Sequence, residues 1–162
     1  MEDTAAAVPG VRIEAPGRPP AHLTELLLDF SGTLALDGVL LPGVADMLTA
    51  LASQVRITVV TADTFGRAHE ALQGLPLTVR IVETGAEKVR LATELGTGNV
   101  VAIGNGRNDV PMFEAAALRI AVMGPEGAAG ELLRAADVVA TDIRSALGLL
   151  MHPLRLKATL RH

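Results

Sequence analysis

Short apolar segments alternate with segments of helical periodicity along most of this chain. The apolar runs cover residues 26–30, 57–60, 79–82, 100–103, 120–123 and 138–140, and each has the length of a strand that is buried on both faces. Helices are predicted over residues 43–53, 65–72, 86–95, 110–117, 128–135 and 142–150. This alternation predicts an α/β fold with an open, three-layer, mostly parallel Rossmann-like sheet and helices on both faces.

The N-terminal residues do not follow this pattern. Residues 1–20 contain four prolines and little periodic apolar content, so we expect a flexible, proline-rich tail, in which residues 11–14 could add a short edge strand. Residues 21–162 are predicted to form a single domain, because the chain has room for one core of ordinary size. Within it, residues 34–41 are predicted to form a small hairpin, or flap, around Asp37-Gly38.

The composition excludes several function classes. The net charge is −4 and aromatic residues make up 2%, so we expect no nucleic-acid partner: nothing supplies a cationic surface for a phosphate backbone or rings for base stacking. The absence of cysteine excludes disulfides and thiolate chemistry. No segment approaches the roughly 20 apolar residues that span a bilayer, and the N-terminus lacks a basic start with an apolar stretch, so we expect a cytoplasmic protein and no membrane partner.

Polar side chains gather where the predicted strands end. Asp29 closes the first run, Thr61-Ala62 follows the second, and residues 104–109 follow the fourth. The carboxyl ends of parallel strands share one edge of the sheet, where such folds bind ligands. Taken singly, Asp29 or Asp109 would most simply cap a turn or a helix. Together with Lys88, they supply a carboxylate nucleophile, groups that hold phosphate oxygens and an oxygen-rich loop suited to Mg²⁺, which predicts phosphoryl transfer.

These residues resemble the haloacid dehalogenase (HAD) superfamily of phosphatases and P-type ATPases. The likeness rests on DFSGT at residues 29–33, Thr61, Lys88 and GNGRND at residues 104–109, which occur in that order. TAD at residues 61–63 and GNGRND are similar to the phosphorylation domain of P-type ATPases. From about His22 to Arg161, the chain resembles the soluble P-type ATPase-like proteins.

The resemblance implies a role for each matching residue. Asp29 would form an aspartyl-phosphate. The implied catalytic residues are Asp29, Ser31, Thr61 and Lys88. Those implied to bind phosphate are Asp29, Ser31, Gly32, Thr61, Ala62 and Lys88. Magnesium would be held by Asp29, the Ser31 carbonyl, Asn105 and Asp109.

Two positions depart from the pattern of the superfamily's phosphatases. Ser31 stands where they usually carry a second aspartate that acts as general acid and base. Because a serine hydroxyl does not titrate near neutral pH, a contribution of about 10² to 10⁴-fold in rate should be largely missing. Asn105 replaces the first acid of the metal loop, so Mg²⁺ should bind more weakly. We therefore expect a slow phosphatase, with a catalytically impaired binding or regulatory module as the alternative.

The predicted site is open. Neither the segment after Asp29 nor the one before Lys88 is long enough for a cap domain. An open site suits a phosphorylated macromolecule, or a phosphorylated small molecule enclosed by a neighbouring subunit, as in the capless sugar-acid phosphatases that assemble as tetramers. A homo-oligomer, dimer or tetramer, is therefore an open alternative. We expect neither the nucleotide-binding domain nor the membrane domain of a P-type ATPase in this chain, so neither ion transport nor ATP binding follows from the resemblance.

Three further features have ordinary explanations. The four histidines lack metal-ligand spacing, and we expect them at the surface. Residues 154–162 mix apolar and basic side chains, which favours a segment packed on its own domain over a docking segment for an anionic partner. GPEGAAGE at residues 124–131 is interpreted as a turn, not as a phosphate-binding loop.

Overall fold

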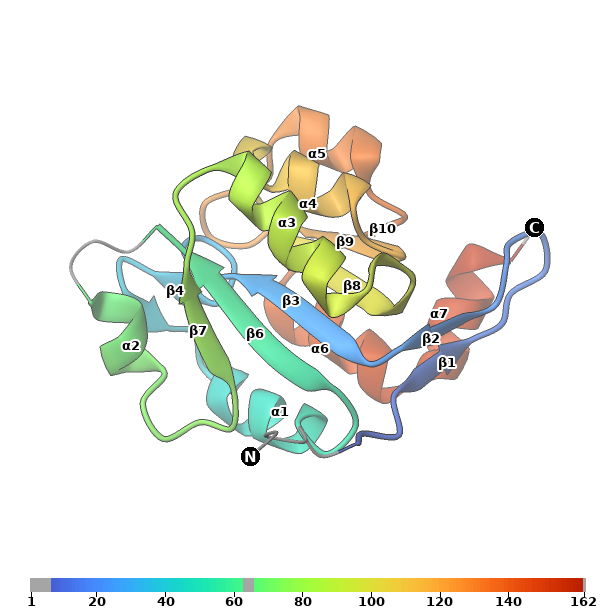
Figure 1. Ribbon diagram of the computed structural model, residues 1–162, viewed down its shortest axis with the longest axis horizontal. Helices are drawn as coiled ribbons and strands as arrows, with labels where there is room; N and C mark the ends of the chain where they lie inside the picture. The colour runs from blue at the N-terminus through green and yellow to red at the C-terminus, as the bar shows by residue number, and fades with distance from the viewer. Residues whose placement is uncertain (1–6, 63–65, 162) are drawn as a thin grey trace.

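The computed structural model describes residues 7–62 and 66–161. A six-stranded parallel sheet forms its centre, with the strand order β10-β9-β8-β3-β6-β7 (Figure 1). Its strands are β3 (Glu25–Asp29), β6 (Arg56–Thr61), β7 (Thr78–Ile81), β8 (Val100–Gly104), β9 (Leu118–Val122) and β10 (Val138–Ala140). Each of the six predicted strands is therefore confirmed, and the parallel α/β architecture with them.

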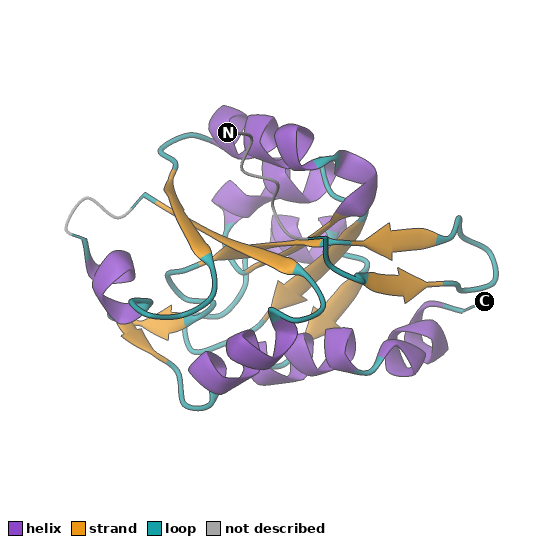
Figure 2. Ribbon diagram, turned by 60° about the horizontal axis from the view of Figure 1, so that its bottom comes forward, coloured by secondary structure: helices purple, strands orange, loops and turns teal. Residues whose placement is uncertain are grey.

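Helices cover both faces of this sheet (Figure 2). One face carries α3 (Gly85–Leu95), α4 (Val110–Glu114) and α5 (Gly130–Ala135), and the other carries α1 (Val44–Leu51) and α6 (Ile143–Met151). Shorter elements are α2 (Arg67–Ala71) and the 3-10 turns η1 (Thr97–Asn99) and η2 (Arg107–Asp109). Position 65, the predicted start of the second helix, lies outside the described residues. None of the helices in the described part of the chain has the length and apolar character needed to cross a membrane.

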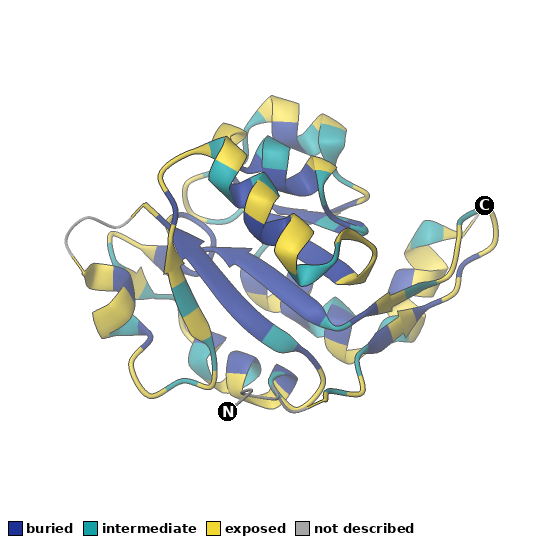
Figure 3. Ribbon diagram, in the orientation of Figure 1, coloured by how far each residue is buried: buried dark blue, intermediate teal, exposed yellow. Residues whose placement is uncertain are grey.

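The central strands are buried on both sides, as their apolar runs predict (Figure 3). Along β3, Leu26 and Leu28 pack into the core under α1 and α6, whereas Leu27 packs into the core under α3 and α4. Successive side chains of a strand point to opposite faces. A continuous leucine run therefore serves two cores at once, and leaves Asp29 as the first polar side chain at its end.

The chain reverses its direction of winding beside β3. From β3 it proceeds through β6 to the edge strand β7, and then returns through α3 to β8 on the other side of β3. This is the topological switch point at which open α/β sheets bind ligands. The ends of β3, β6 and β8 therefore meet at one edge of the sheet.

The predicted flap is present as a small hairpin between β3 and α1. Strands β4 (Ala35–Leu36) and β5 (Val39–Leu40) pair antiparallel. At the two turn residues, φ is 51° for Asp37 and 82° for Gly38. Two successive positive φ angles are typical of a type I′ turn, which matches the twist of a two-residue hairpin. Asp-Gly is one of the few pairs that adopt it readily, so the sequence signal was sufficient here.

The described part of the predicted loose tail is structured. β1 (Val11–Ile13) pairs antiparallel with β2 (Ala21–Leu23) in a separate hairpin, and does not extend the central sheet as an edge strand. Val11 and Ile13 point to the same face of β1, since Arg12 between them is exposed. That face packs into the core shared with α1 and α6, so both side chains are buried. Two well-placed apolar residues thus outweigh the proline content of this stretch.

An unpredicted helix, α7 (Pro153–Leu160), covers this hairpin. Figure 1 shows it beside β1 and β2. Leu156 is completely buried, whereas Leu154 is 79% exposed. The prediction that this segment packs on its own domain is confirmed, although its helical form was missed. Proline at the first position of the helix is compatible with that form, since this residue donates no intrahelical bond.

Candidate active site

A pocket of about 270 Å³ opens at the switch point. It is lined by most of the residues predicted for the site: Asp29, Ser31, Thr61, Ala62, Lys88 and Asn105. They come from the ends of β3, β6 and β8 and from α3. Asp109 lies beneath the pocket, fully buried, and Gly32 lies in the turn after Asp29. The structure thus brings together the residues that the strand-end argument selected, while Asp63 falls outside the described residues.

Asp29 is held rigidly at the end of β3. The Phe30 carbonyl accepts backbone hydrogen bonds from residues 33, 34 and 35, which turns the chain sharply away from the strand. Asp29 is only 8% exposed. Burial first and the neighbouring Asp109 carboxylate second raise the pKa of Asp29 to about 8, against the opposing effects of Lys88 and of hydrogen bonds with Phe30 and Thr33. The protein alone therefore leaves the charge on this carboxylate poorly balanced.

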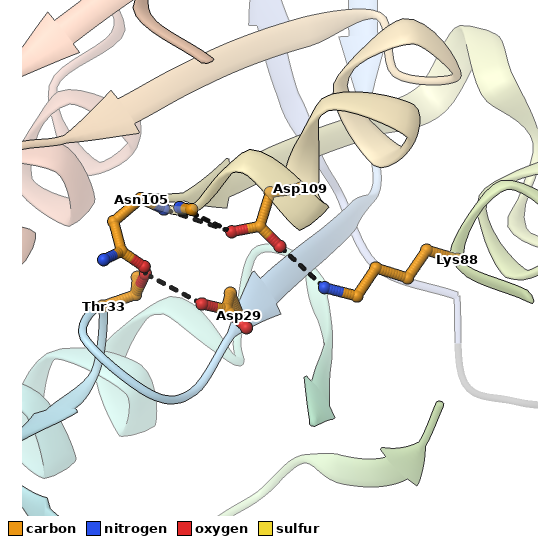
Figure 4. Close-up of polar contacts among 6 residues, drawn as sticks. Asp29, Thr33, Lys88, Asn105 and Asp109 are labelled. Atoms are coloured by element: carbon orange, nitrogen blue, oxygen red, sulfur yellow. Dashed lines mark hydrogen bonds and ion pairs between the residues drawn. The ribbon is translucent and has the colours of Figure 1, made fainter. Parts of the chain in front are cut away.

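Asp109 and Lys88 form a buried ion pair. Lys88 Nζ lies 2.8 Å from Asp109 Oδ1 (Figure 4), and the two side chains are 5% and 0% exposed. The other oxygen of Asp109 accepts hydrogen bonds from the backbone N–H groups of Asn105 and Gly106, at 3.2 and 3.1 Å. These contacts close the loop between β8 and α4 around one carboxylate. Asp109 thereby holds the lysine at the pocket wall, where its charge can meet an anion.

Thr33 links the nucleophile candidate to the metal loop, a role that the strand-end argument missed. Its hydroxyl is fully buried and lies 3.4 Å from Asp29 Oδ2 and 3.1 Å from Asn105 Oδ1. Thr33 is the last residue of the DFSGT motif, so its type was visible in the sequence. Its contact with Asn105 was not, because that contact spans two strands.

The loop after β9 also reaches the site. Asn105 Nδ2 donates to the Gly127 carbonyl at 3.2 Å, and Ala129 N–H donates to the Asn105 carbonyl at 2.9 Å. Predicted as a turn, this loop does form turns, and it also braces Asn105. The carboxyl end of β9 lies at the same edge of the parallel sheet, and that rule could have drawn attention to it.

The residues present suit a hard divalent cation. Among residues 7–62 and 66–161, no three acidic or histidine side chains lie close enough to hold a metal by themselves. Two buried carboxylates, Asp29 and Asp109, are instead accompanied by the amide oxygen of Asn105, and the raised pKa of Asp29 reports unbalanced negative charge. An ion that prefers oxygen ligands would balance it.

A second, wider pocket lies beside the flap. It has a volume of about 450 Å³ and is lined by flap residues 37–40 together with Arg67, Glu70 and Ala71 of α2. Val39 of the flap is 69% exposed. None of the strand-end residues lines this pocket, so the pocket beside Asp29 remains the candidate active site.

Comparison with protein families agrees with this architecture. A family model described as haloacid dehalogenase-like hydrolase matches residues 52–146, more than half of the chain, and the chain therefore belongs to that family. The matched region begins after β3, so it includes Thr61, Lys88 and Asp109 but not Asp29. An uncharacterized protein of Methanocaldococcus jannaschii is 42% identical over 84 residues, which cover 48% of this chain and 90% of that protein.

Solved structures share the fold. A putative HAD family hydrolase from Streptomyces avermitilis has a TM-score of 0.68 at 20% identity, with 91% of each chain covered. The 3-deoxy-D-manno-octulosonate 8-phosphate phosphatase of Moraxella catarrhalis, in complex with a magnesium ion, a phosphate ion and a KDO molecule, has a TM-score of 0.69 at 16% identity, with 84% of this chain and 90% of that one covered. A zinc-transporting PIB-type ATPase in its E2.Pi state has a TM-score of 0.61 at 27% identity, over 75% of this chain and 20% of that one. These structures share the fold of the haloacid dehalogenase-like hydrolases, the family to which the chain belongs.

Proposed function

We propose that this protein is a Mg²⁺-dependent phosphohydrolase of low turnover that acts through an aspartyl-phosphate on Asp29. Its substrate would be a phosphate monoester or an acyl phosphate. The observation that carries the proposal is the position of Asp29: a buried carboxylate at the switch point, lining a pocket with Thr61 and Lys88 and lying beside Asp109. A buried carboxylate without a balancing partner is costly, and such sites are frequently functional.

The reaction would have two displacements. In the first, an Asp29 oxygen attacks the phosphorus atom, the new O–P bond forms, and the bond to the leaving-group oxygen breaks. Thr61 and Lys88 would hold the phosphoryl oxygens by a hydroxyl and an ammonium group. In the second, water attacks the phosphorus and gives up a proton to the solvent, the bond to Asp29 breaks, and inorganic phosphate leaves with the carboxylate restored.

The cation site would consist of Asp29, the Ser31 carbonyl, Asn105 and Asp109. Mg²⁺ would supply positive charge that balances the carboxylates and the transferring phosphoryl group. A solved phosphatase of similar fold holds magnesium and phosphate, which supports this part of the proposal.

Ser31 is the reason to expect slow turnover. It lines the pocket two residues after Asp29, but its hydroxyl cannot protonate a leaving group or activate water near neutral pH. Good leaving groups, which need no proton, should therefore be favoured. A persisting aspartyl-phosphate is also what the likeness to the P-type ATPase phosphorylation domain implies, and similarity to a zinc-transporting ATPase structure supports it.

The access route would be open and capless. Only the flap lies between β3 and α1, and three residues, Val82–Thr84, separate β7 from α3. A phosphorylated macromolecule could reach Asp29 directly. A phosphorylated small molecule would need a second subunit to enclose it, and the exposed Val39 of the flap supports such a homo-oligomer, a dimer or tetramer. We place the protein in the cytoplasm.

A catalytically impaired binding or regulatory module is the second candidate. It is favoured by the neutral side chains at Ser31 and Asn105, and by the engagement of Lys88 with Asp109 instead of the open pocket. In this case phosphate or a partner would bind without turnover.

Phosphate release from an aryl phosphate, measured with and without Mg²⁺, tests the proposal. We expect weak, Mg²⁺-dependent release that Asp29→Asn abolishes, whereas Asp46→Asn on the exposed side of α1 leaves it unchanged. Trapping with a phosphoryl-mimicking fluoride complex should place that complex against Asp29. Equal release by the wild type and Asp29→Asn would assign the activity to another source.

A further inference from the structure

The loop after β9 contacts the turn that follows Asp29. Gly32 has a φ of 75°, and a Cβ built there would collide with Glu126 Oε2 and lie 2.6 Å from Asn105 Nδ2. The Glu126 carboxylate and the Asn105 amide nitrogen therefore approach the same point beside the Gly32 α-carbon. Only glycine leaves room for this arrangement at a positive φ. The close approach joins three segments: the turn after β3, the loop after β8 and the loop after β9.

The orientation of the Asn105 amide is decided by its neighbours. The Gly127 carbonyl can only accept a hydrogen bond, so Asn105 must present Nδ2 to it, at 3.2 Å. Asn105 Oδ1 then faces the opposite way and accepts from Thr33 at 3.1 Å. Figure 4 shows this oxygen turned toward Thr33 and Asp29, with the nitrogen turned away. The nitrogen carries a second N–H, and a Glu126 carboxylate oxygen lies near this nitrogen, since both atoms approach the same point beside Gly32.

We propose that Glu126 is a positioning residue, which holds the amide oxygen of Asn105 toward the cation site beside Asp29. This inference rests on the proposed function, in which Asn105 and Asp29 contribute to a Mg²⁺ site. If the amide turned over, its oxygen would face the Glu126 carboxylate and its N–H groups would face the cation, and both contacts are unfavourable. Glu126 thereby disfavours the orientation in which Asn105 could not be a ligand.

The same geometry makes Glu126 a partner for asparagine and not for aspartate. An aspartate at position 105 has no N–H to orient, because both of its oxygens only accept hydrogen bonds. The orienting effect of Glu126 on cation binding should therefore disappear in an Asn105→Asp background, where only the general attraction of its negative charge for the cation remains. A merely structural contact, or an unspecific contribution of negative charge, would act equally in both backgrounds.

Cation affinity, measured by calorimetry with Mg²⁺ and by electron paramagnetic resonance with Mn²⁺, tests the inference. Outer partners of metal ligands typically contribute about 10 to 100-fold in affinity, and for the exposed Glu126 we expect about tenfold loss in Glu126→Ala. Glu126→Gln keeps a carbonyl that can accept the amide N–H, so it should retain most of the affinity. In an Asn105→Asp background, Glu126→Ala should cost much less affinity, and no more than Glu126→Gln. Glu114→Ala, an exposed site on α4, is the matched control.

Each outcome decides between explanations. Wild-type affinity in Glu126→Ala would overturn the inference. Equal losses in Glu126→Ala and Glu126→Gln, the same in both backgrounds, would assign the effect to charge alone and overturn it as well.

A second readout needs no metal. The side-chain amide signals of Asn105 in an NMR spectrum should shift in Glu126→Ala and stay near their wild-type positions in Glu126→Gln. If wild-type protein binds neither cation, the proposed Mg²⁺ dependence fails, and the Asn105 signals still report whether Glu126 orients this amide. Unchanged Asn105 signals in Glu126→Ala would refute the positioning role.

Discussion

Replacing Asp29 with asparagine is expected to make the metal-free protein more stable. Burial first and the Asp109 carboxylate second raise the pKa of Asp29 from 3.8 to about 8. A group whose pKa is higher in the folded state contributes stability that is fully present below the unfolded pKa and is lost as pH rises toward the folded pKa. At neutral pH, Asp29 therefore opposes folding. Asparagine has nearly the same shape, carries no charge, and can accept the hydrogen bond from Thr33.

The magnitude follows from the two pKa values. One pKa unit corresponds to about 1.4 kcal/mol. Between the unfolded pKa of 3.8 and pH 7, the penalty on the wild type rises to at most about 4 kcal/mol. Asp29→Asn avoids this penalty, so its advantage should grow by about 1.4 kcal/mol per pH unit over that interval and level off near pH 8.

Urea unfolding in EDTA at several pH values between 5 and 8 measures this difference. Asp142→Asn is a control of opposite sign. The Ser145 backbone N–H lowers the pKa of Asp142, and its contribution is present above the unfolded pKa and lost as pH falls through the folded pKa. Asp142 caps α6; asparagine is also a good N-cap, so Asp142→Asn should cost less than the roughly 1 kcal/mol of a replacement by alanine. Because the pKa of Asp142 is lowered below its usual value of 3.8, this cost should not change across the range.

Two results would refute this reasoning about Asp29. One is an Asp29→Asn protein that is no more stable than the wild type at pH 7. The other is a gain in stability that does not depend on pH between 5 and 8. Adding Mg²⁺ should reduce the gain, because a ligand that binds only the wild-type folded state stabilises that protein alone.

Three further predictions follow from the site and the core. Ser31→Asp should raise turnover of an aryl phosphate by about 10²-fold or more, since it restores a titrating group near the nucleophile; an unchanged kcat would place the limitation elsewhere. Lys88→Met should destabilise the fold by about 3 to 5 kcal/mol in chemical unfolding, because it leaves Asp109 buried without its counter-charge; a stable variant would contradict this. Leu156→Ala should cost about 2 to 4 kcal/mol and Leu154→Ala almost nothing, since the first is fully buried and the second 79% exposed; equal costs would show that α7 does not pack as described.

The sequence-based view of the fold succeeded where local signals were strong. The apolar runs of the central strands are continuous because both faces of those strands are buried, as in β3. Asp37-Gly38 predicted the flap turn because few other residue pairs adopt two positive φ angles. The β1 hairpin and α7 were misjudged for a shared reason: each is short, and each packs in part against the other, which lies far away in the sequence.

Residue types and chain order determined that a carboxylate would close the first strand, and that a hydroxyl, a lysine and an oxygen-rich loop would follow in parallel-sheet positions. Only the tertiary structure decided which groups touch. In the folded protein, Asp109 lies beneath the pocket and pairs with Lys88, and Thr33 lies between Asp29 and Asn105. The loop after β9 also approaches this site, beside Gly32. The physical reason is that strand propensity acts locally along the chain, whereas burial, charge pairing and amide orientation depend on neighbours supplied by other strands.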